Sequence, residues 1–144
     1  MNFPRSTDDV AKEITICCEK TENIGELRIR QLINILEKVP DEYVLGGILK
    51  ILENDHPYFP YQKYCGMILA DVNPKPSAQI STIINQVITN WDKSLHQLPT
   101  WLKINFGKDA VNEELDILIE LQENSTSIDK LRTMKWWLEQ ENLF

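Results

Sequence analysis

The sequence predicts an all-α fold of about eight short antiparallel helices stacked as hairpins. Helix-start signals recur every 15 to 19 residues, apolar side chains follow helical rather than strand periodicity, and no Asn-Gly hairpin turn occurs. The starts are expected near Ser6, Asn23, Asp41, Pro60, Ser77, Ser94, Asp109 and Ser127. Each interval would hold one helix and one tight turn, and two intervals would form a hairpin of about 35 residues. This spacing is typical of an α-solenoid.

The bulk composition fits one domain over residues 1–144, with 42% hydrophobic and 26% charged residues. The net charge of −7 argues against binding to nucleic acid or to an anionic membrane, because both need clustered Lys and Arg. We find no signal-peptide pattern and no apolar run near the roughly 18 residues of a membrane span. Three cysteines, an odd number, favour a reducing compartment, so a cytoplasmic protein is expected.

The first three helices differ in how much apolar surface they present. Cys17 and Cys18 lie about 100° apart on the first helix, so at most one should face the core. Residues 24–39 carry an apolar face and stop at Pro40; its members are Ile24, Leu27, Leu32, Ile35, Leu36 and Val39. The helix from Asp41 is apolar over a wider arc, which predicts burial on two sides. Its Gly46-Gly47 pair predicts a close helix crossing; the alternative, a phosphate loop, lacks the following Lys.

The remaining helices are marked by proline, serine and glycine signals. Pro60 should lie in the first turn of its helix, and Ser77 should cap the next one. Ser94 and Gln97 have capping-box spacing, but Pro99 predicts that this segment splits into a turn and a second piece. That piece holds Trp101, Ile104 and Phe106 and ends at Gly107. Segments 109–122 and 127–140 are expected to form the last hairpin, around residues 124–126.

The helix spacing resembles that of HEAT and armadillo repeats over the whole chain. The stretch Lys63-Tyr64-Cys65-Gly66-Met67-Ile68-Leu69-Ala70 resembles the second helix of a HEAT unit most closely. The other hairpins do not repeat it clearly, which leaves an irregular helical array or a closed bundle as the alternative. The resemblance implies a scaffold for binding proteins, and occasionally an enzyme on a concave helical surface, and it carries over no site residues.

Residues suited to catalysis or metal binding are few. His56 and His96 lie about 40 residues apart, and neither has a Cys, His or acidic partner at metal-ligand spacing. We therefore expect no catalytic residue, no metal and no cofactor. The remaining alternative is an enzyme with a site in a groove between hairpins, using Cys65, His56 and the nearby tyrosines.

Aromatic side chains suggest contacts with a partner. Tyrosines on a loop and the following turn, such as Tyr58, are typical of protein interfaces, although Phe59 and Tyr64 could instead fill the gap between hairpins. Trp136 falls nearly opposite the core side of the last helix. Either the tail 143–144 covers it, or self-association or a partner protein does.

Five carboxylates form the strongest surface signal. They lie within a sector of roughly 80° of one helix and are Asp109, Glu113, Asp116, Glu120 and Glu123. The core side opposite is predicted to hold Val111, Leu115, Leu118 and Leu121. Like charges at these spacings cost about 0.2–0.5 kcal/mol each. The carboxylates form either a solvated face, relieved by Lys130, Arg132 and Lys135 of the next helix, or a surface for a cationic partner.

The sequence thus favours a non-enzymatic protein-binding module that uses an acidic helix face and exposed aromatics, with a basic protein as the expected partner. A second alternative is a small acidic immunity or inhibitor protein that neutralises a basic toxin by electrostatically steered association. The enzyme with a groove between hairpins is the third.

Overall fold

The computed structural model describes residues 3–55 and 59–141, and within them the chain is all-α, with eight helices and no strand. The all-α prediction is confirmed. The helices are α1 (Thr7–Cys18), α2 (Glu22–Leu36), α3 (Asp41–Glu53), α4 (Pro60–Val72), α5 (Ile80–Val87), α6 (Gln97–Phe106), α7 (Lys108–Leu121) and α8 (Ser125–Leu138). None of them is long and apolar enough to span a bilayer.

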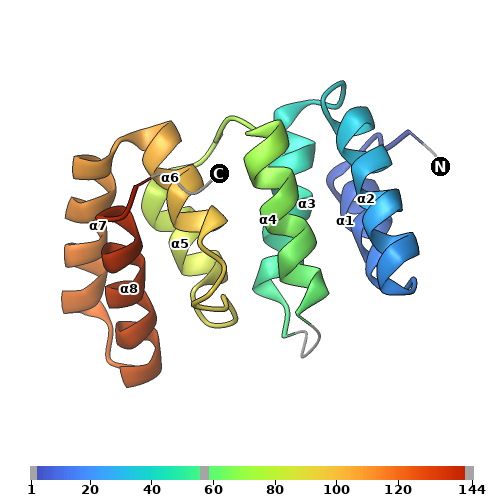
Figure 1. Cartoon of the computed structure of the whole chain (residues 1–144). Coiled ribbons are helices and arrows are strands. Elements are labelled where there is room, and N and C mark those ends of the chain that lie inside the picture. Colours follow the sequence, from blue (N-terminus) through green and yellow to red (C-terminus); the bar gives the residue numbers. More distant parts are fainter. Residues whose placement is uncertain (1–2, 56–58, 142–144) are drawn as a thin grey trace.

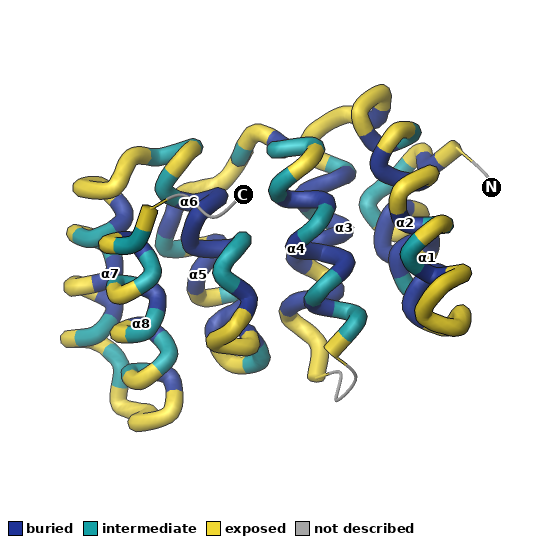
Figure 2. The backbone as a smooth tube through the Cα atoms, viewed as in Figure 1, coloured by how far each residue is buried: buried dark blue, intermediate teal, exposed yellow. Residues whose placement is uncertain are grey.

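The helices pack in two rows that run from one end of the molecule to the other (Figure 1). In the odd-numbered row, α1 packs on α3, α3 on α5 and α5 on α7; in the even-numbered row, α2 packs on α4, α4 on α6 and α6 on α8. Helix α1 also packs on α2, α3 on α4, and α7 on α8. Figure 2 shows the buried residues where neighbouring helices meet. The two ends of the array are therefore formed by α1 and α2 on one side and by α7 and α8 on the other.

Glycine allows a close helix crossing, as predicted. A Cβ atom at Gly47 would lie 2.6 Å from Val10 Cγ1, and one at Gly46 would lie 2.8 Å from Thr7 Oγ1. Helix α1 therefore lies directly against α3 at this pair. Burial of α3 on two sides is also confirmed, because α3 packs on α1, α4 and α5.

Two predictions for the first hairpin are wrong. Cys17 and Cys18 are both buried, because α1 is covered over a wide arc by α2, α3 and α4. Ile24 and Leu27 were placed on the core side of their helix, yet they are 55% and 61% exposed. The buried side of α2 is instead centred on Ile29, Leu32, Ile33 and Leu36, about a third of a turn away.

The helix starts predicted at Ser77 and Ser94, before α5 and α6, are also wrong. Ser77 is exposed and α5 begins only at Ile80, while Ser94 lies in a turn and donates its backbone N–H to Asp92 Oδ1 (2.9 Å). Helix α6 begins at Gln97 and includes Pro99 in its first turn, where the backbone N–H has no helical partner to lose. Gly107 ends α6 with φ of +89°, a conformation that favours glycine, as expected.

Buried polar side chains hold the irregular segments in place. Trp101 Nε1 donates to the Pro74 carbonyl oxygen (2.9 Å), and Trp91 Nε1 donates to the Leu95 carbonyl oxygen (3.1 Å). Gln62 of α4 reaches the turn after α5: its Nε2 donates to the Asn90 carbonyl oxygen (2.6 Å), and its Oε1 accepts from the Asp92 N–H (2.9 Å). These bonds fix the turn on which α8 packs.

Candidate functional site

The five predicted carboxylates are all exposed, and we call them the acidic stripe (Asp109, Glu113, Asp116, Glu120 and Glu123). The first four lie on α7, but the prediction that Glu123 continues the same helix is wrong, because α7 ends at Leu121 and Gln122 is extended. Val111, Leu115 and Leu118 are buried on the opposite side of the helix and fix its orientation. From Asp109 to Glu120 the stripe extends about 17 Å along the axis of α7. Leu121 was predicted to be in the core but is 74% exposed, because it lies on the flank of the helix in the last turn.

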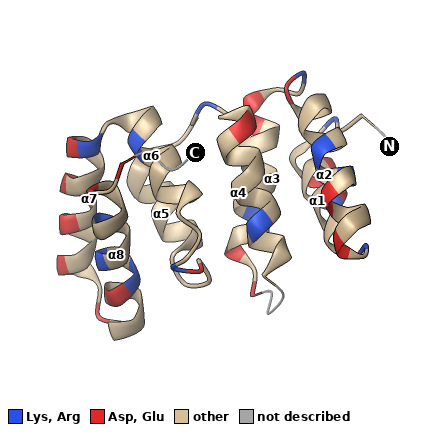
Figure 3. Cartoon of the chain, viewed as in Figure 1, with Lys and Arg blue, Asp and Glu red and all other residues tan. Residues whose placement is uncertain are grey.

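The acidic stripe faces outward from the end of the array. Glu114, on the α5 side of α7, lines a shallow cavity with Ile80 and Ser81 of α5. Asp116 and Lys108 reach α8, where they pair with Lys135 and Glu139. The stripe occupies the arc that points away from α5, and Figure 3 shows its acidic residues repeating along the outer edge of α7. A further helix stacked on this end would meet the carboxylates first.

Only one of the three basic residues predicted to relieve the stripe does so. Lys135 pairs with Asp116, while Lys130 donates to the Thr89 carbonyl oxygen (2.6 Å) and Arg132 is exposed. None of the ion pairs between described residues includes the other four members of the stripe, Asp109, Glu113, Glu120 and Glu123. Four carboxylates of the stripe therefore make no ion pair with another described residue.

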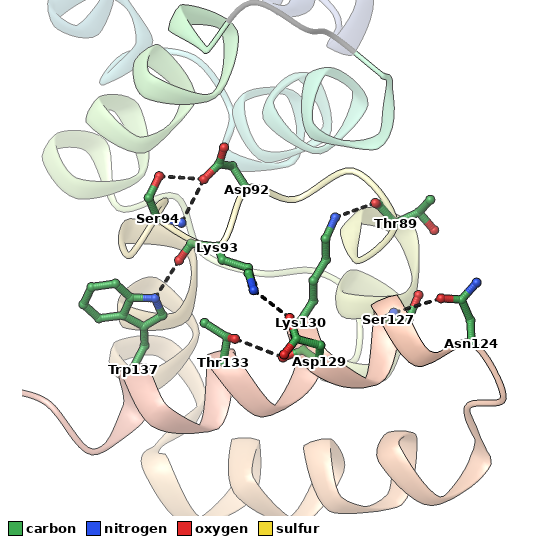
Figure 4. Close-up of polar contacts among 10 residues, drawn as sticks. All are labelled: Thr89, Asp92, Lys93, Ser94, Asn124, Ser127, Asp129, Lys130, Thr133 and Trp137. Atoms are coloured by element: carbon green, nitrogen blue, oxygen red, sulfur yellow. Dashed lines mark hydrogen bonds and ion pairs between the residues drawn. The ribbon is translucent and has the colours of Figure 1, made fainter.

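Figure 4 shows the contacts that attach α8 to the turn between α5 and α6, and this attachment sets which side of α8 faces outward. Trp137 Nε1 donates to the Lys93 carbonyl oxygen (2.8 Å), and Lys93 Nζ pairs with Asp129 (2.6 Å). Together with the bond from Lys130 to Thr89, these contacts fix one side of α8 to the turn between α5 and α6. Burial lowers the pKa of Lys130, because desolvation penalises its charged form.

Trp136 lies about 100° round the helix from Trp137 and is 56% exposed. Its ring contacts only the edge of Trp137 among the aromatic rings of the described residues, with centroids 4.8 Å apart. The tail 143–144, which was predicted as one cover for Trp136, lies outside the described residues. Trp136 and the acidic stripe thus belong to one hairpin, and we call the stripe together with Arg132, Lys135 and Trp136 the α7–α8 end surface.

The other predicted aromatic site is only partly described. Tyr58 and His56 lie outside the described residues. Phe59 is partly exposed at the start of α4, whereas Tyr64 is buried between α4 and α2, with its hydroxyl oxygen 2.7 Å from where a Cβ atom of Gly25 would be. Tyr64 therefore fills the gap between hairpins.

The reactive groups considered for an enzyme are not assembled into a site in the described part of the chain. Cys65 is fully buried, its Sγ lies 3.9 Å from the Ile48 carbonyl oxygen, and burial raises the pKa of its thiol. The ring of His96 packs on Trp137 with centroids 5.5 Å apart. The cavity at α5 and α7, about 360 Å³, is lined by Gln79, Ile80, Ser81, Phe106 and Glu114, a set without His or Cys.

No metal cluster is found among the described residues, because no three of their His, Cys, Asp and Glu side chains lie close enough to share an ion. The sequence reasoning missed the ion pair of buried Glu13 with partly buried Arg28, whose charged groups are 3.6 Å apart beside Cys17. Burial raises the pKa of the Cys17 thiol, and the Arg28 guanidinium opposes that shift. These groups join α1 to α2.

Comparison with known proteins found no match: no family model fits the chain, and neither a curated protein nor a solved structure is similar to it.

Proposed function

We propose that the chain is a non-enzymatic protein-binding module that meets its partner at the α7–α8 end surface. The observation that carries the proposal is that four exposed carboxylates, which make no ion pair with another described residue, lie on the same hairpin as the exposed Trp136. The partner would present a basic segment of about three helical turns, or an extended strand of similar length, with an apolar side chain against Trp136. We further propose that the two helical rows form a solenoid of HEAT type in a cytoplasmic protein.

The need for a polar outer face at the end of a helical array does not by itself explain the α7–α8 end surface. The last repeat of a helical array needs a polar outer face, but interspersed Lys and Glu would provide one at lower cost to the helix. A single-sign stripe instead weakens α7 while raising the local negative potential. An exposed Trp136 is the residue type that most often anchors an interface, and Ile117 and Leu121 add exposed apolar area beside the stripe.

Charge reversal with a matched control tests the proposal. The partner is first captured from the native host at low and at moderate salt, and its affinity for purified protein is then measured. Glu113→Lys, Glu120→Lys and Glu123→Lys together should weaken binding about tenfold or more, since each exposed pair contributes about 0.2–1 kcal/mol and reversal adds repulsion. The control reverses three exposed carboxylates elsewhere, Glu37, Glu53 and Asp71.

The control variant should bind with nearly the affinity of the wild type. Its net charge changes as much as that of the stripe variant, so equal losses in both would show that binding follows net charge and not this surface. The inhibitor of a basic toxin is a special case of the same proposal. Rescue of growth when the chain is co-expressed with a toxin from a neighbouring gene would select it.

A further inference from the structure

An exposed apolar strip runs along α7 beside the acidic stripe. Its three members are Ala110, Ile117 and Leu121, which lie within about 40° of one another round the helix. Ile117 is 49% exposed and Leu121 is 74% exposed, so about half or more of each side chain is open to solvent. Large apolar side chains grouped on one exposed face of a helix indicate a surface for another molecule.

Carboxylates flank the apolar strip on both sides. The acidic stripe lies about a quarter of a turn from the centre of the strip, with Glu113 and Glu120 on that flank. On the other flank, Glu114 lies about 40° from the centre and lines the cavity with Ile80 and Ser81 of α5. In the described part of the chain, no ion pair includes any of these three carboxylates. The strip is therefore complementary to an occupant that is apolar in the middle and cationic at both edges.

The cavity between α5 and α7 leaves room for side chains of such an occupant. Its volume of about 360 Å³ is at the lower end of ordinary ligand pockets, and Ile80 and Phe106 are its apolar walls. The ring of Phe106 meets the ring of fully buried Trp101 edge-on, with centroids 6.3 Å apart. The core thus holds this wall in place beside the strip.

The backbone of the occupant is expected to be helical. An extended segment pressed on Ile117 and Leu121 would bury backbone N–H and C=O groups, and the described residues contain no strand that could pair with them. A helix satisfies these groups internally. In addition, Glu113, Ile117 and Leu121 lie four residues apart and form one ridge of α7, which is the kind of row that fits the groove of a second helix.

We propose that the partner binds α7 with an amphipathic basic α-helix, whose apolar face packs on the apolar strip and whose Lys and Arg residues lie opposite the acidic stripe and Glu114. This inference rests on the proposed function and names the chemistry of its partner. From Ala110 to Leu121 the strip extends about 17 Å, so the bound helix has about three turns. Its apolar residues recur every three or four positions. A basic extended segment and a partner held by charge alone are the competing occupants.

Two synthetic peptides of about 18 residues, long enough to form a helix, test the inference by fluorescence anisotropy. Both contain the same numbers of leucine and lysine residues; one has helical periodicity and the other alternates. The helical peptide should bind the wild type about tenfold more tightly. Ile117→Ser with Leu121→Ser should weaken its binding about tenfold or more, because apolar area is no longer buried. Ile24→Ser with Leu27→Ser, the same two residue types at exposed positions of α2, is the control and should bind like the wild type.

The outcomes separate this inference from the proposed function. Equal affinity for the two peptides, unchanged binding in the α7 variant, or an equal loss in the α2 control each overturns helix docking on the strip. The captured partner is measured with the same variants. If its binding falls on reversal of Glu113, Glu120 and Glu123 but not on loss of Ile117 and Leu121, the proposed function stands and helix docking is wrong. Circular dichroism verifies that each variant keeps its helical signal, which is expected because all four serine positions are exposed.

Discussion

Gln62 should be one of the most sensitive polar positions in the molecule. Its amide makes two hydrogen bonds from α4 to the turn after α5, to the Asn90 carbonyl oxygen at 2.6 Å and from the Asp92 N–H at 2.9 Å. Replacing it with methionine keeps the volume and the flexible shape but removes both bonds. The two backbone groups would then lie in a partly buried site without a partner.

The expected loss of stability follows from these two groups. An unsatisfied buried donor or acceptor costs about 1–3 kcal/mol, and the lower part of that range applies because both bonds are only partly buried. Gln62→Met should therefore lower the free energy of unfolding by about 2–4 kcal/mol. Asn85→Ala, on the exposed side of α5, is the control and should change it by less than about 0.5 kcal/mol.

Urea unfolding followed by tryptophan fluorescence measures this loss, because Trp91 is fully buried next to the turn that Gln62 holds. With a slope of about 2 kcal/mol per molar urea, the midpoint should fall by about 1–2 M. A shift no larger than that of the control would mean that the turn does not depend on Gln62, and it would refute the reasoning.

Three further predictions concern the core, the thiols and the stripe. Gly47→Ala should lower the free energy of unfolding by about 1 kcal/mol in urea unfolding, because overpacking against Val10 exceeds the gain in helix propensity. The pKa of Cys18 is raised to about 12 by burial, so stability measured in urea should fall as pH rises from about 9 to 12, and less steeply in Cys18→Ala. Glu113→Gln with Glu120→Gln should raise stability by about 1 kcal/mol at low salt in thermal unfolding, by removing three like-charge pairs on α7.

For each of these three predictions, one result would contradict it. A gain in stability for Gly47→Ala would mean that α1 and α3 are further apart than described. The folded thiol stays protonated while the unfolded thiol ionises, so a stability that rises above pH 9 or an unchanged slope in Cys18→Ala would contradict the burial of that group. A loss of stability in the double glutamine variant would mean that the stripe is neutralised by contacts within the molecule.

Local chemistry in the sequence was enough to place most of the fold. Ser6 accepts from the Asp9 N–H (3.1 Å) as a helix cap should, Pro60 begins α4, and the Gly46-Gly47 pair marks a close crossing. These features act within a few residues or through steric size, so periodicity and residue type reveal them. The order in which the helices pack requires distances between hairpins, which spacing alone does not supply.

The wrong predictions share a physical cause, which is that a neighbouring helix decides which face is buried. Cys18 is buried because α4 covers a flank of α1 that the sequence left open. Ile24 is exposed because no helix among the described residues packs on that side of α2. Ser94 has capping-box spacing, but its hydroxyl donates to Asp92 instead (2.6 Å), a local bond that competes with a helix start.

The sequence predicts each part of the candidate site but not how these parts are arranged relative to one another. The acidic stripe and the outward Trp136 each follow from angles round a single helix. Their place on one end surface depends on the bonds from α8 to the turn at residues 89–93, which join positions more than 35 residues apart.

The central claim is that a partner covers the α7–α8 end surface. Carboxylate labelling with glycine ethyl ester, read by mass spectrometry, measures it directly on the protein with and without bound partner, whether that partner is a second copy or another protein. We expect slower labelling of Glu113 and Glu120 in the complex and unchanged labelling of Glu37 and Asp71. Unchanged labelling of the stripe, with protection of carboxylates elsewhere, would contradict the claim.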